Sequence, residues 1–450
     1  MNTSAEPIIS VSGLRGVVGE SLTPLVAARY AAAFAAELPA GAVVITRDGR
    51  TTGAMLAAAI TAALQAMGRK VIDAGIAATP TTGVLVREQQ AVGGIQISAS
   101  HNPAQYNGLK LFSAAGRVIP SADGAAVLAR YRSGELPWVD HGRVGNAQTC
   151  SDSSEPHWRL IRRIVDVHLI ERRRLTVLLD ANHGAGSILA RRMLEELGCR
   201  VKILGGDPNG RFEHPPEPTE ENLSGLLAAV KESNANIGFC QDPDADRLAV
   251  IDENGRYLGE EYTLAMCVDH VLRRRKGAIV SNCSTSRMSE DLAAKYGVPF
   301  HRSAVGEANV VDKMLETGAI LGGEGNGGVI DPRVGLVRDS FVGMAMLLEA
   351  MAARDRPISE LADELPRYSI VKTKITLAPG NVSAGMEALQ RHFTGATCDC
   401  LDGVRFDWPG KWLLVRASNT EPIVRAIAEA ATADEARRLC DESAKVLARA

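Results

Sequence analysis

Short apolar runs rich in β-branched residues alternate with longer Ala- and Leu-rich stretches along most of the chain. The run Ala42–Ile45 follows a helical pattern over Leu25–Leu38. A second helical pattern over Thr51–Met67 leads into the run Lys70–Ala74. The same succession returns at Leu175–Asp180 before Ile188–Leu197, and at Ala278–Ser281 before Arg287–Tyr296. Strands that alternate with helices predict right-handed βαβ units and mainly parallel sheets.

The last part of the chain has a different pattern. Trp412–Arg416 and Ile423–Glu429 have the composition of two strands joined by a polar turn. Thr432 has the position of an N-cap before a final helix. One face of that helix would carry Ala436, Leu439, Cys440, Val446 and Leu447. Strand, turn, strand and helix predict a small α+β domain that begins near Tyr368.

The length and the two patterns together predict the architecture. At about 100–200 residues per domain, 450 residues predict two to four domains. We therefore expect an α/β protein with three tandem α/β domains, whose sheets are mixed and mainly parallel, and a smaller C-terminal α+β domain. Polar stretches at Gln148–Pro156 and Glu253–Gly255 mark candidate boundaries between domains.

Composition places the chain in the globular class and excludes several partners. Hydrophobic residues make up 46% and charged residues 23%, and 50 Lys and Arg against 53 Asp and Glu leave a net charge of −3. This balance and the 4% of aromatic residues argue against nucleic acid as a partner. The apolar stretch Ala54–Met67 is short of the roughly 20 residues of a membrane span. No secretory signal opens the sequence and eight cysteines are scattered along it, so we expect a reduced, cytoplasmic protein without a membrane partner.

A serine loop follows an apolar strand within Gln96–Phe112. It holds Ser100 and His101, and Lys110 stands further along the same segment. A serine hydroxyl is a weak nucleophile unless another group takes its proton or stabilises negative charge nearby. The alternative is an ordinary polar turn closed by Pro103.

A second loop, Gln241–Arg247, carries three alternating carboxylates at the end of an apolar run. Asp242, Asp244 and Asp246 can converge on one hard cation, and without a cation they would repel one another. An EF-hand loop would require glycine where Arg247 stands, and a haloacid-type phosphatase would require threonine in place of Asp246. The segment that follows has the pattern of a hairpin rather than of an exit helix. A solvated acidic turn remains the plainest alternative to a metal site.

A glycine-rich loop, Gly322–Gly328, follows a third apolar run. Its glycines allow the backbone to approach a ligand closely, and Glu324 and Asn326 offer an acceptor and a donor for sugar hydroxyls. Most glycine-rich turns are only turns, so this loop alone has little weight.

The fourth stretch, Arg416–Arg425, lies between the two predicted strands of the tail. Ser418, Asn419 and Thr420 supply neutral donors in a turn, and guanidinium groups flank them. A phosphate dianion is bound by such neutral donors together with a bidentate cation. The alternative is a surface turn with unrelated arginines.

Together, and in this order, the four stretches resemble the α-D-phosphohexomutase superfamily, which includes phosphoglucomutases, phosphomannomutases and phosphoglucosamine mutases. The resemblance extends to Ser12–Gly16, Arg47–Arg50, Thr79–Thr81 and Asp180–Asn182. It implies four domains around a central cleft. The expected divisions are 1–153 with the phosphoserine loop, 154–253 with the metal loop, 254–367 with the sugar loop and 368–450 with the phosphate-binding loop.

The resemblance also implies a function, an isomerase that moves a phosphoryl group within a hexose phosphate. Ser100 would carry a covalent phosphate, and one Mg²⁺ per chain would be bound by that phosphate and the three aspartates. The partner would be a small sugar phosphate, and the protein a monomer or homodimer. Catalytic roles are expected for Ser100, Lys110, Arg15 and His101. Substrate-binding roles are expected for Arg247, Arg302, Glu324, Asn326, Arg416, Ser418, Asn419, Thr420 and Arg425.

Two departures from the family pattern bear on the substrate and on proton transfer. Many relatives have a histidine, a proposed acid or base, where Gly328 stands. A lysine that phosphomannomutase/phosphoglucomutase members often carry just before Val305 is missing, although Arg302 is present. Both departures favour a phosphoglucosamine mutase, which converts glucosamine 6-phosphate to glucosamine 1-phosphate. The alternatives are a phosphomannomutase/phosphoglucomutase or a metal-dependent sugar-phosphate phosphatase.

Overall fold

The computed structural model describes residues 6–10, 13–376, 382–417 and 423–449. The chain divides into two compact units, and each is described by itself. Residues 1–271 and 326–362 form the first unit, and residues 272–325 and 363–450 form the second.

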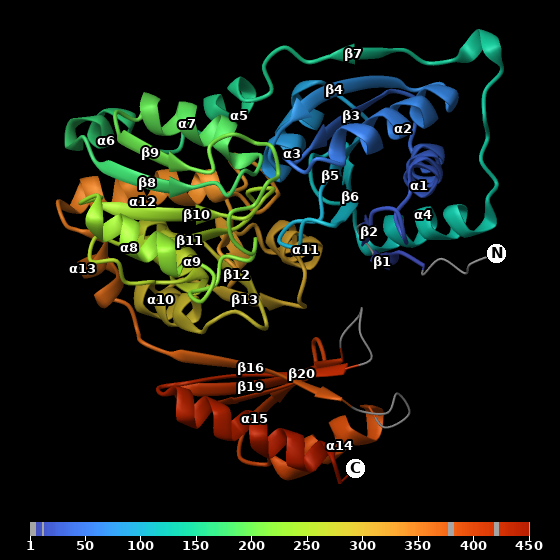
Figure 1. The fold of residues 1–450 in the computed structure, drawn as a ribbon. Helices are drawn as coiled ribbons and strands as arrows, with labels where there is room; N and C mark the ends of the chain where they lie inside the picture. The colour runs from blue at the N-terminus through green and yellow to red at the C-terminus, as the bar shows by residue number, and fades with distance from the viewer. Residues whose placement is uncertain (1–5, 11–12, 377–381, 418–422, 450) are drawn as a thin grey trace. The chain divides into compact units, whose positions relative to one another are not determined.

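The first unit opens with a seven-stranded mixed sheet and its helices (Figure 1). In chain order the elements are β1 (Ile8–Ser10), β2 (Gly13–Val17), α1 (Pro24–Glu37), β3 (Ala42–Arg47), α2 (Gly53–Ala66), β4 (Lys70–Ile76), α3 (Thr79–Glu88), β5 (Gly93–Ile97), β6 (Tyr106–Ser113), α4 (Ser121–Ser133) and β7 (Ala147–Thr149). The strand order is β1-β2-β6-β5-β3-β4-β7. Val43 and Ile45 of β3 belong to a core with α1 and α2, whereas Val44 belongs to a core with α3. Burial on both faces explains why the apolar run is continuous rather than alternating.

Local signals set the ends of the predicted helices. The side chain of Thr23 accepts a hydrogen bond from the Val26 backbone N–H, and Pro24 begins α1. Gly68 follows α2 with a φ of 74°, a left-handed conformation that glycine adopts without steric cost. The two helices predicted before Ala42 and before Lys70 are therefore confirmed.

A four-stranded sheet with the order β11-β10-β8-β9 follows in the same unit. Its elements are α5 (Glu155–Ile161), α6 (Val167–Arg173), β8 (Thr176–Asp180), α7 (Gly186–Glu196), β9 (Arg200–Leu204), α8 (Ser224–Glu232), β10 (Ile237–Gln241) and β11 (Leu248–Asp252). Strand β10 pairs in parallel with β8 and antiparallel with β11. The loops that follow β8 and β10 therefore leave the sheet at one edge, where ligands of α/β sheets usually bind.

The third α/β segment is shared between the two units. Helix α9 (Glu260–Arg274) leads into the second unit, and the chain returns to the first unit at Asn326. The elements that follow α9 in this segment are β12 (Ile279–Asn282), α10 (Met288–Tyr296), β13 (Phe300–Ser303), α11 (Glu307–Thr317), β14 (Leu321–Glu324), β15 (Gly328–Ile330), α12 (Ser340–Arg354) and α13 (Ile358–Asp363). Within the second unit, β12 pairs in parallel with both β13 and β14.

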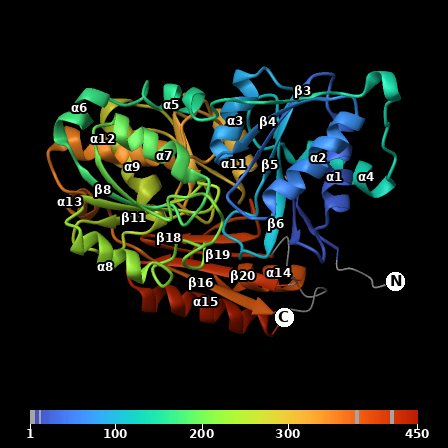
Figure 2. The same cartoon turned by 45° about the horizontal axis from the view of Figure 1, so that its top comes forward.

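The C-terminal part of the second unit is an antiparallel sheet with two helices on one face (Figures 1 and 2). Its elements are β16 (Ser369–Thr376), α14 (Val382–His392), β17 (Thr397–Asp399), β18 (Val404–Trp408), β19 (Lys411–Ala417), β20 (Ile423–Ala430) and α15 (Ala433–Leu447). The strand order is β16-β20-β19-β18-β17. Thr432 caps α15 by accepting a hydrogen bond from the Glu435 backbone N–H. Of the predicted helix face, Ala436, Leu439, Cys440 and Leu447 are buried and Val446 is partly buried.

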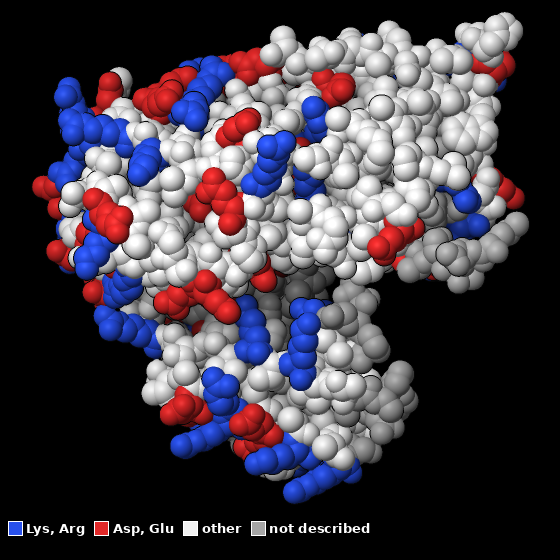
Figure 3. All heavy atoms as spheres, in the orientation of Figure 1, with Lys and Arg blue, Asp and Glu red and all other residues white. Residues whose placement is uncertain are grey.

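These sheets confirm the predicted fold class, three mixed and mainly parallel α/β sheets and an antiparallel C-terminal sheet. The domain divisions at 153, 253 and 367 stay predictions. None of the helices in the described ranges combines the length and the hydropathy that crossing a membrane requires. On the face drawn in Figure 3, basic and acidic side chains are interspersed, as the nearly balanced charge implies.

Candidate active site

The serine loop joins β5 to β6 in the first unit and is held by a short relay of hydrogen bonds. Ser98 Oγ donates to Asp48 Oδ2 at 2.7 Å, and the Ser100 backbone N–H donates to Ser98 Oγ at 2.9 Å. Ser100 is almost fully buried and has a φ of 51°, which is uncommon for a residue with a side chain. The relay therefore holds the loop backbone at Ser100 in this left-handed conformation.

Arg50 organises the same loop from behind. Its guanidinium donates to four carbonyl oxygens, those of Ser100 (2.7 Å), Asn102 (2.6 Å), Pro103 (2.7 Å) and Tyr106 (3.1 Å). Its Nε also donates to Asp48 Oδ2 at 3.1 Å. The sequence pointed to Arg50 only through the Arg47–Arg50 motif, and its role in the loop becomes evident from these contacts.

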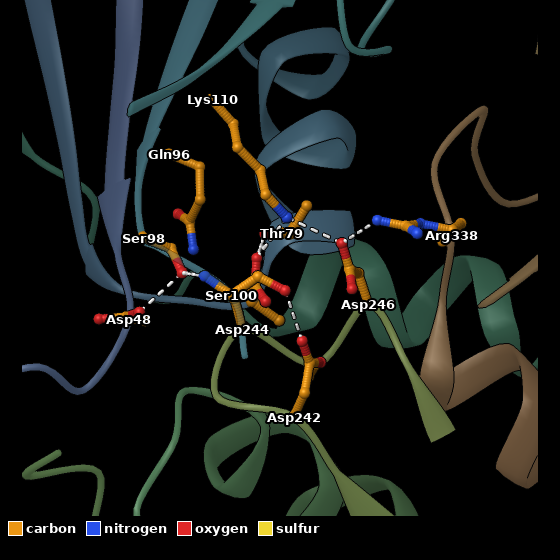
Figure 4. A network of polar contacts seen from close by, with 12 residues as sticks. Asp48, Thr79, Gln96, Ser98, Ser100, Lys110, Asp242, Asp244, Asp246 and Arg338 are labelled. Carbon is orange, nitrogen blue, oxygen red and sulfur yellow. Dashed lines mark hydrogen bonds and ion pairs between the residues drawn. The ribbon is translucent and has the colours of Figure 1, made fainter. Parts of the chain in front are cut away.

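The three aspartates lie in the turn between β10 and β11, and all three side chains are fully buried. Their carboxylates offer ligand atoms that lie within 4.8 Å of one another. Ser100 Oγ donates to Asp242 Oδ2 at 2.7 Å. The structure thus brings together the serine loop and the acidic loop, as Figure 4 shows. A solvated acidic turn, the plain alternative, is excluded by the burial of these side chains.

Cations surround the carboxylates on the side away from Asp242. Lys110 Nζ donates to Asp244 Oδ2 at 2.6 Å and to Asp246 Oδ2 at 2.8 Å. Arg338 Nη2 donates to the same oxygen of Asp246 at 2.7 Å (Figure 4). Lys110 was among the predicted residues. Arg338 was not, because nothing in its local sequence connects it with a turn so far away along the chain.

The charges and the burial of the cluster act in opposite directions on its pKa values. Burial raises the pKa of Asp242 well above its usual range, and the charges of Asp244 and Asp246 add to this effect. Burial acts on Asp246 in the same way, but the charges of Arg338 and Lys110 outweigh it and lower its pKa. Burial lowers the pKa of Lys110, but Asp244 and Asp246 raise it overall, so Lys110 stays charged.

Two buried oxygens of this cluster accept no hydrogen bond from the residues described and fit a hard divalent cation. Asp244 Oδ1 and Asp246 Oδ1 are buried and accept no hydrogen bond within the described part of the chain. A buried acceptor without a partner costs about 1–3 kcal/mol, so it indicates a missing ligand. Because all the available donor atoms are carboxylate and hydroxyl oxygens, Mg²⁺ fits the set better than zinc does.

The other predicted catalytic residues lie close to Ser100. His101 Nδ1 is 3.3 Å from Ser100 Oγ, and burial together with the charges of Arg247 and Arg15 lowers the pKa of His101 to about 2. Arg15 Nη1 donates to Asn102 Oδ1 at 3.2 Å, and burial lowers its pKa. The Arg247 backbone N–H donates to Asp242 Oδ1 at 3.2 Å. A neutral imidazole therefore lies beside the serine hydroxyl, and Arg15 and Arg247 contact the serine loop and the acidic turn.

The predicted sugar loop runs from the second unit, which contains Glu324, into the first unit, which contains Asn326. In the second unit, Glu324 Oε1 accepts hydrogen bonds from Asn282 Nδ2 at 2.7 Å and from the Gly306 backbone N–H at 3.1 Å. In the first unit, Asn326 Oδ1 accepts a hydrogen bond from the Gly328 backbone N–H at 3.3 Å. Both predicted side chains are thus oriented by backbone or amide partners.

The remaining predicted residues belong to the second unit. Arg302 forms ion pairs with Asp407 at 3.1 Å and with Glu290 at 2.5 Å. Arg416 and Arg425 are directly paired across β19 and β20. Arg416 Nε also donates to Asp402 Oδ1 at 3.1 Å. Ser418, Asn419 and Thr420 lie outside the described residues.

The structure also brings together a group of metal-binding residue types that sequence analysis missed. Asp180, His214 and Cys240 offer ligand atoms within 4.8 Å of one another. Asp180 and Cys240 are partners in the register of β8 and β10, whereas His214 comes from the loop after β9. The signal available in the sequence was weak, because three different residue types stood far apart without any known spacing.

Comparison with protein families agrees with this geometry. Four models of the phosphoglucomutase/phosphomannomutase family match the chain in order. The alpha/beta/alpha domains I, II and III match residues 8–137, 155–255 and 260–368, and the C-terminal domain matches residues 379–446.

Individual relatives are similar over nearly their whole length. A phosphoglucomutase/phosphomannomutase of Thermococcus kodakarensis is 37% identical, over 97% of both chains. A probable phosphoglucosamine mutase of Pyrococcus horikoshii is 36% identical, over 95% of both chains.

Solved structures are similar in fold. A phosphoglucomutase/phosphomannomutase family protein from Burkholderia thailandensis has a TM-score of 0.86 and 28% identity, over 98% of this chain and 96% of that one. The Aspergillus fumigatus N-acetylphosphoglucosamine mutase, solved with GlcNAc-6P and magnesium, shares the fold with a TM-score of 0.53 and 16% identity, over 94% of this chain and 98% of that one. From these matches and the site geometry, the chain belongs to the phosphoglucomutase/phosphomannomutase family of the α-D-phosphohexomutase superfamily, and it is a phosphohexomutase.

Proposed function

We propose that this phosphohexomutase interconverts hexose 6-phosphate and hexose 1-phosphate through a phosphoserine at Ser100 and a sugar bisphosphate. The observation that carries the proposal is the 2.7 Å hydrogen bond from Ser100 Oγ to Asp242, within the buried carboxylate turn. A phosphoryl group on Ser100 would lie against the side chains best suited to hold a divalent cation. Phosphoryl transfer needs this combination of charge neutralisation and positioning more than it needs covalent help.

The proposed reaction has two transfers that mirror each other. A sugar hydroxyl oxygen bonds to the phosphorus of phosphoserine, the bond from phosphorus to Ser100 Oγ breaks, and the hydroxyl proton is taken up by a base. After the bisphosphate reverses its orientation, its other phosphoryl group returns to Ser100 by the same steps. Asp242, Asp244 and Asp246 would hold Mg²⁺, which supplies neutralisation of the phosphoryl charge.

Three residues close to Ser100 are proposed to manage the protons. Lys110 keeps its proton because Asp244 and Asp246 hold it as a cation, so it is suited to donating a hydrogen bond or a proton to a departing oxygen. Burial shifts the pKa of Arg15 in the direction that a base requires. His101, with a pKa of about 2, is a neutral acceptor beside Ser100 Oγ.

Sugar-binding and phosphate-binding roles are proposed for residues in each unit separately. Glu324 and Asn326, each oriented by a partner, are suited to accepting and donating hydrogen bonds with sugar hydroxyls. Arg247 and Arg302 are proposed as further contacts. The cross-strand pair Arg416 and Arg425, with Ser418, Asn419 and Thr420, is proposed to bind the phosphate that is not being transferred.

Glucosamine phosphate is the substrate that we propose, converted from the 6-phosphate to the 1-phosphate. The P. horikoshii relative is named as a probable phosphoglucosamine mutase, and the carboxylate of Glu324 could pair with the ammonium group of an amino sugar. The T. kodakarensis relative, named as a phosphoglucomutase/phosphomannomutase, supports the second candidate.

One assay separates these substrates and the phosphatase alternative. Purified full-length enzyme, primed with glucose 1,6-bisphosphate and Mg²⁺, is given glucosamine, glucose or mannose 6-phosphate, and ³¹P NMR follows 1-phosphate and inorganic phosphate. We expect 1-phosphate from all productive substrates, the highest kcat/KM for glucosamine 6-phosphate, and no turnover by Ser100→Ala. A higher kcat/KM for glucose or mannose would overturn the substrate assignment, and stoichiometric inorganic phosphate would overturn the mutase mechanism.

A further inference from the structure

On two aspartates of the acidic turn, one carboxylate oxygen accepts two hydrogen bonds and the other accepts none from the described part of the chain. On Asp244, Oδ2 accepts hydrogen bonds from Thr79 Oγ1 and from Lys110 Nζ, whereas Oδ1 accepts none. On Asp246, Oδ2 accepts from Lys110 Nζ at 2.8 Å and from Arg338 Nη2 at 2.7 Å, whereas Oδ1 accepts none. Within the described residues, each of these two carboxylates therefore presents one oxygen that accepts two hydrogen bonds and one buried oxygen that accepts none. Arg247 Nε lies 3.9 Å from Asp246 Oδ1, an ion pair that is longer than a hydrogen bond.

Arg338 is fixed in this role by its neighbours. The Asp339 backbone N–H donates to the Val329 carbonyl oxygen at 2.8 Å, and the Asp339 side chain caps α12. Ser340 Oγ donates to the Ala245 carbonyl oxygen at 2.7 Å, which attaches the segment to the acidic turn itself. The segment that carries Arg338 therefore cannot shift without disturbing the turn.

Gly328 leaves room for the stem of Arg338. A Cβ atom at this position would lie 2.3 Å from Cδ, 2.7 Å from Cγ and 2.9 Å from Cβ of Arg338. These distances are all shorter than van der Waals contact, and the last involves an atom that cannot move without the backbone. Any side chain at this position would therefore displace Arg338 from Asp246.

We propose that Thr79, Lys110 and Arg338 restrict Asp244 and Asp246 to one metal-ligating oxygen each, and that this restriction selects Mg²⁺ over Ca²⁺. The inference rests on the proposed metal site at the acidic turn. Mg²⁺ requires near-octahedral coordination at 2.0–2.1 Å, which single carboxylate oxygens and water satisfy. Ca²⁺ takes six to eight oxygens at 2.3–2.6 Å and uses bidentate carboxylates. Removing a donor from a saturated oxygen should therefore favour Ca²⁺.

The selectivity is measured without any sugar or turnover. Mn²⁺ bound to the full-length protein is followed by electron paramagnetic resonance and displaced with Mg²⁺ or with Ca²⁺, which yields a Kd for each ion. We expect Arg338→Ala to shift the ratio of Ca²⁺ to Mg²⁺ affinity toward Ca²⁺ by about tenfold, within the range found for residues that orient metal ligands. Thr79→Val, which keeps the shape and the backbone N–H donor to the Asp244 carbonyl oxygen, should shift the ratio in the same direction.

Gly328→Ala tests the same inference by displacing the Arg338 side chain without removing it. It should change the ratio as Arg338→Ala does, and it should add little when combined with Arg338→Ala, because the two closest contacts, with Cδ and Cγ, are then gone and only the 2.9 Å contact with Cβ remains. Gly225→Ala, where a Cβ meets nothing within 4 Å, and Arg333→Ala, whose guanidinium pairs with Asp331 in the same loop, are the matched controls and should leave the ratio unchanged.

Two results would overturn the inference. Equal changes in Ca²⁺ and Mg²⁺ affinity would mean that Arg338 contributes only charge, since charge alone does not distinguish two divalent ions. Unchanged Mn²⁺ binding in Asp244→Asn would mean that the cation binds elsewhere. Neither depends on the mutase assay, so a failure of the proposed function is detected separately.

Discussion

Two polar clusters lie at the same edge of the β11-β10-β8-β9 sheet, and they differ in how their buried acceptors are satisfied. In the cluster around Asp180, Oδ1 accepts from the Asn182 backbone N–H at 2.8 Å and Oδ2 lies 2.8 Å from His214 Nε2. The other ring nitrogen of His214 lies 2.9 Å from the Pro215 carbonyl oxygen. Both ring nitrogens thus face acceptors, and an imidazolium satisfies both.

The acidic turn after β10 is not satisfied in this way. Asp244 and Asp246 each keep a buried oxygen without a hydrogen-bond donor among the described residues. The two clusters contain metal-binding residue types alike, but they differ in whether their buried oxygens all accept hydrogen bonds. Complete hydrogen bonding indicates that Asp180 and His214 support the loops, whereas buried acceptors without a hydrogen bond agree with the metal site that we propose at the acidic turn.

The largest expected effect comes from the serine that contacts the unsatisfied cluster. Ser100→Ala should lower turnover at least about 1,000-fold, because it removes the hydroxyl that contacts Asp242 and that carries the phosphoryl group in the proposed mechanism. Ser187→Ala is the matched control, since Ser187 is a buried serine in the first turn of α7 whose hydroxyl donates to the Gly184 carbonyl oxygen. Steady-state kinetics and phosphopeptide mapping check both variants. An active Ser100→Ala variant with phosphate on another residue would contradict the mechanism.

The dependence of activity on metal should change with substitutions in the acidic turn and not with substitutions in the cluster around Asp180. Excess chelator should abolish activity reversibly, and Asp244→Asn should raise the Mg²⁺ concentration needed for half-maximal activity by about 10–100-fold. Cys240→Ala, in the satisfied cluster, should leave that concentration unchanged. Activity measured against Mg²⁺ concentration decides the matter. Full activity in excess chelator, or a shift in Cys240→Ala as large as in Asp244→Asn, would break the comparison.

Much of the fold and part of the site could be predicted because the signals are local. The run at Leu175–Asp180, followed by a helical pattern, became β8 and α7, and Thr432 caps α15 as expected. That Ser100 and the aspartates meet was implied by the resemblance to the superfamily, which rests on the short motifs that carry them. In such cases the composition of one short segment carries the information.

Arg338 and the cluster around Asp180 could not be predicted for the opposite reason. Arg338 reaches Asp246 from a segment distant in the sequence, and one arginine among many has no distinguishing pattern. The satisfied state of Asp180 depends on His214, which a long loop brings back to the sheet edge. Which oxygen of a carboxylate is left unpaired is a property of tertiary structure alone.

An intermediate effect is expected for the cross-strand arginines of the second unit, which are proposed to bind the phosphate that is not being transferred. Arg416→Ala and Arg425→Ala should each lower kcat/KM in both directions by about 10- to 100-fold, because a charge-assisted hydrogen bond contributes about 1.5–3 kcal/mol. Kinetics measured separately from the 6-phosphate and from the 1-phosphate check this. Mass spectrometry should still find phosphate on Ser100. Wild-type values in both directions would mean that the non-reacting phosphate is bound elsewhere.

The smallest effect is expected from the satisfied cluster, and it depends on pH. Burial lowers the pKa of His214, but the hydrogen bond and the charge of Asp180 outweigh it and raise the pKa overall. A raised folded-state pKa stabilises the protein fully below the unfolded value of about 6.5, and this contribution is lost as pH rises through the folded value.

The wild type should therefore exceed His214→Gln in free energy of unfolding by a larger margin at pH 5.5 than at pH 9. Because His214 is partly exposed, the change should be below about 1 kcal/mol. Urea unfolding at the two pH values, with and without chelator, measures it. If the margin grew with pH, or if chelator removed it, His214 would be a neutral ligand, and the two clusters would share a function that their hydrogen bonds otherwise separate.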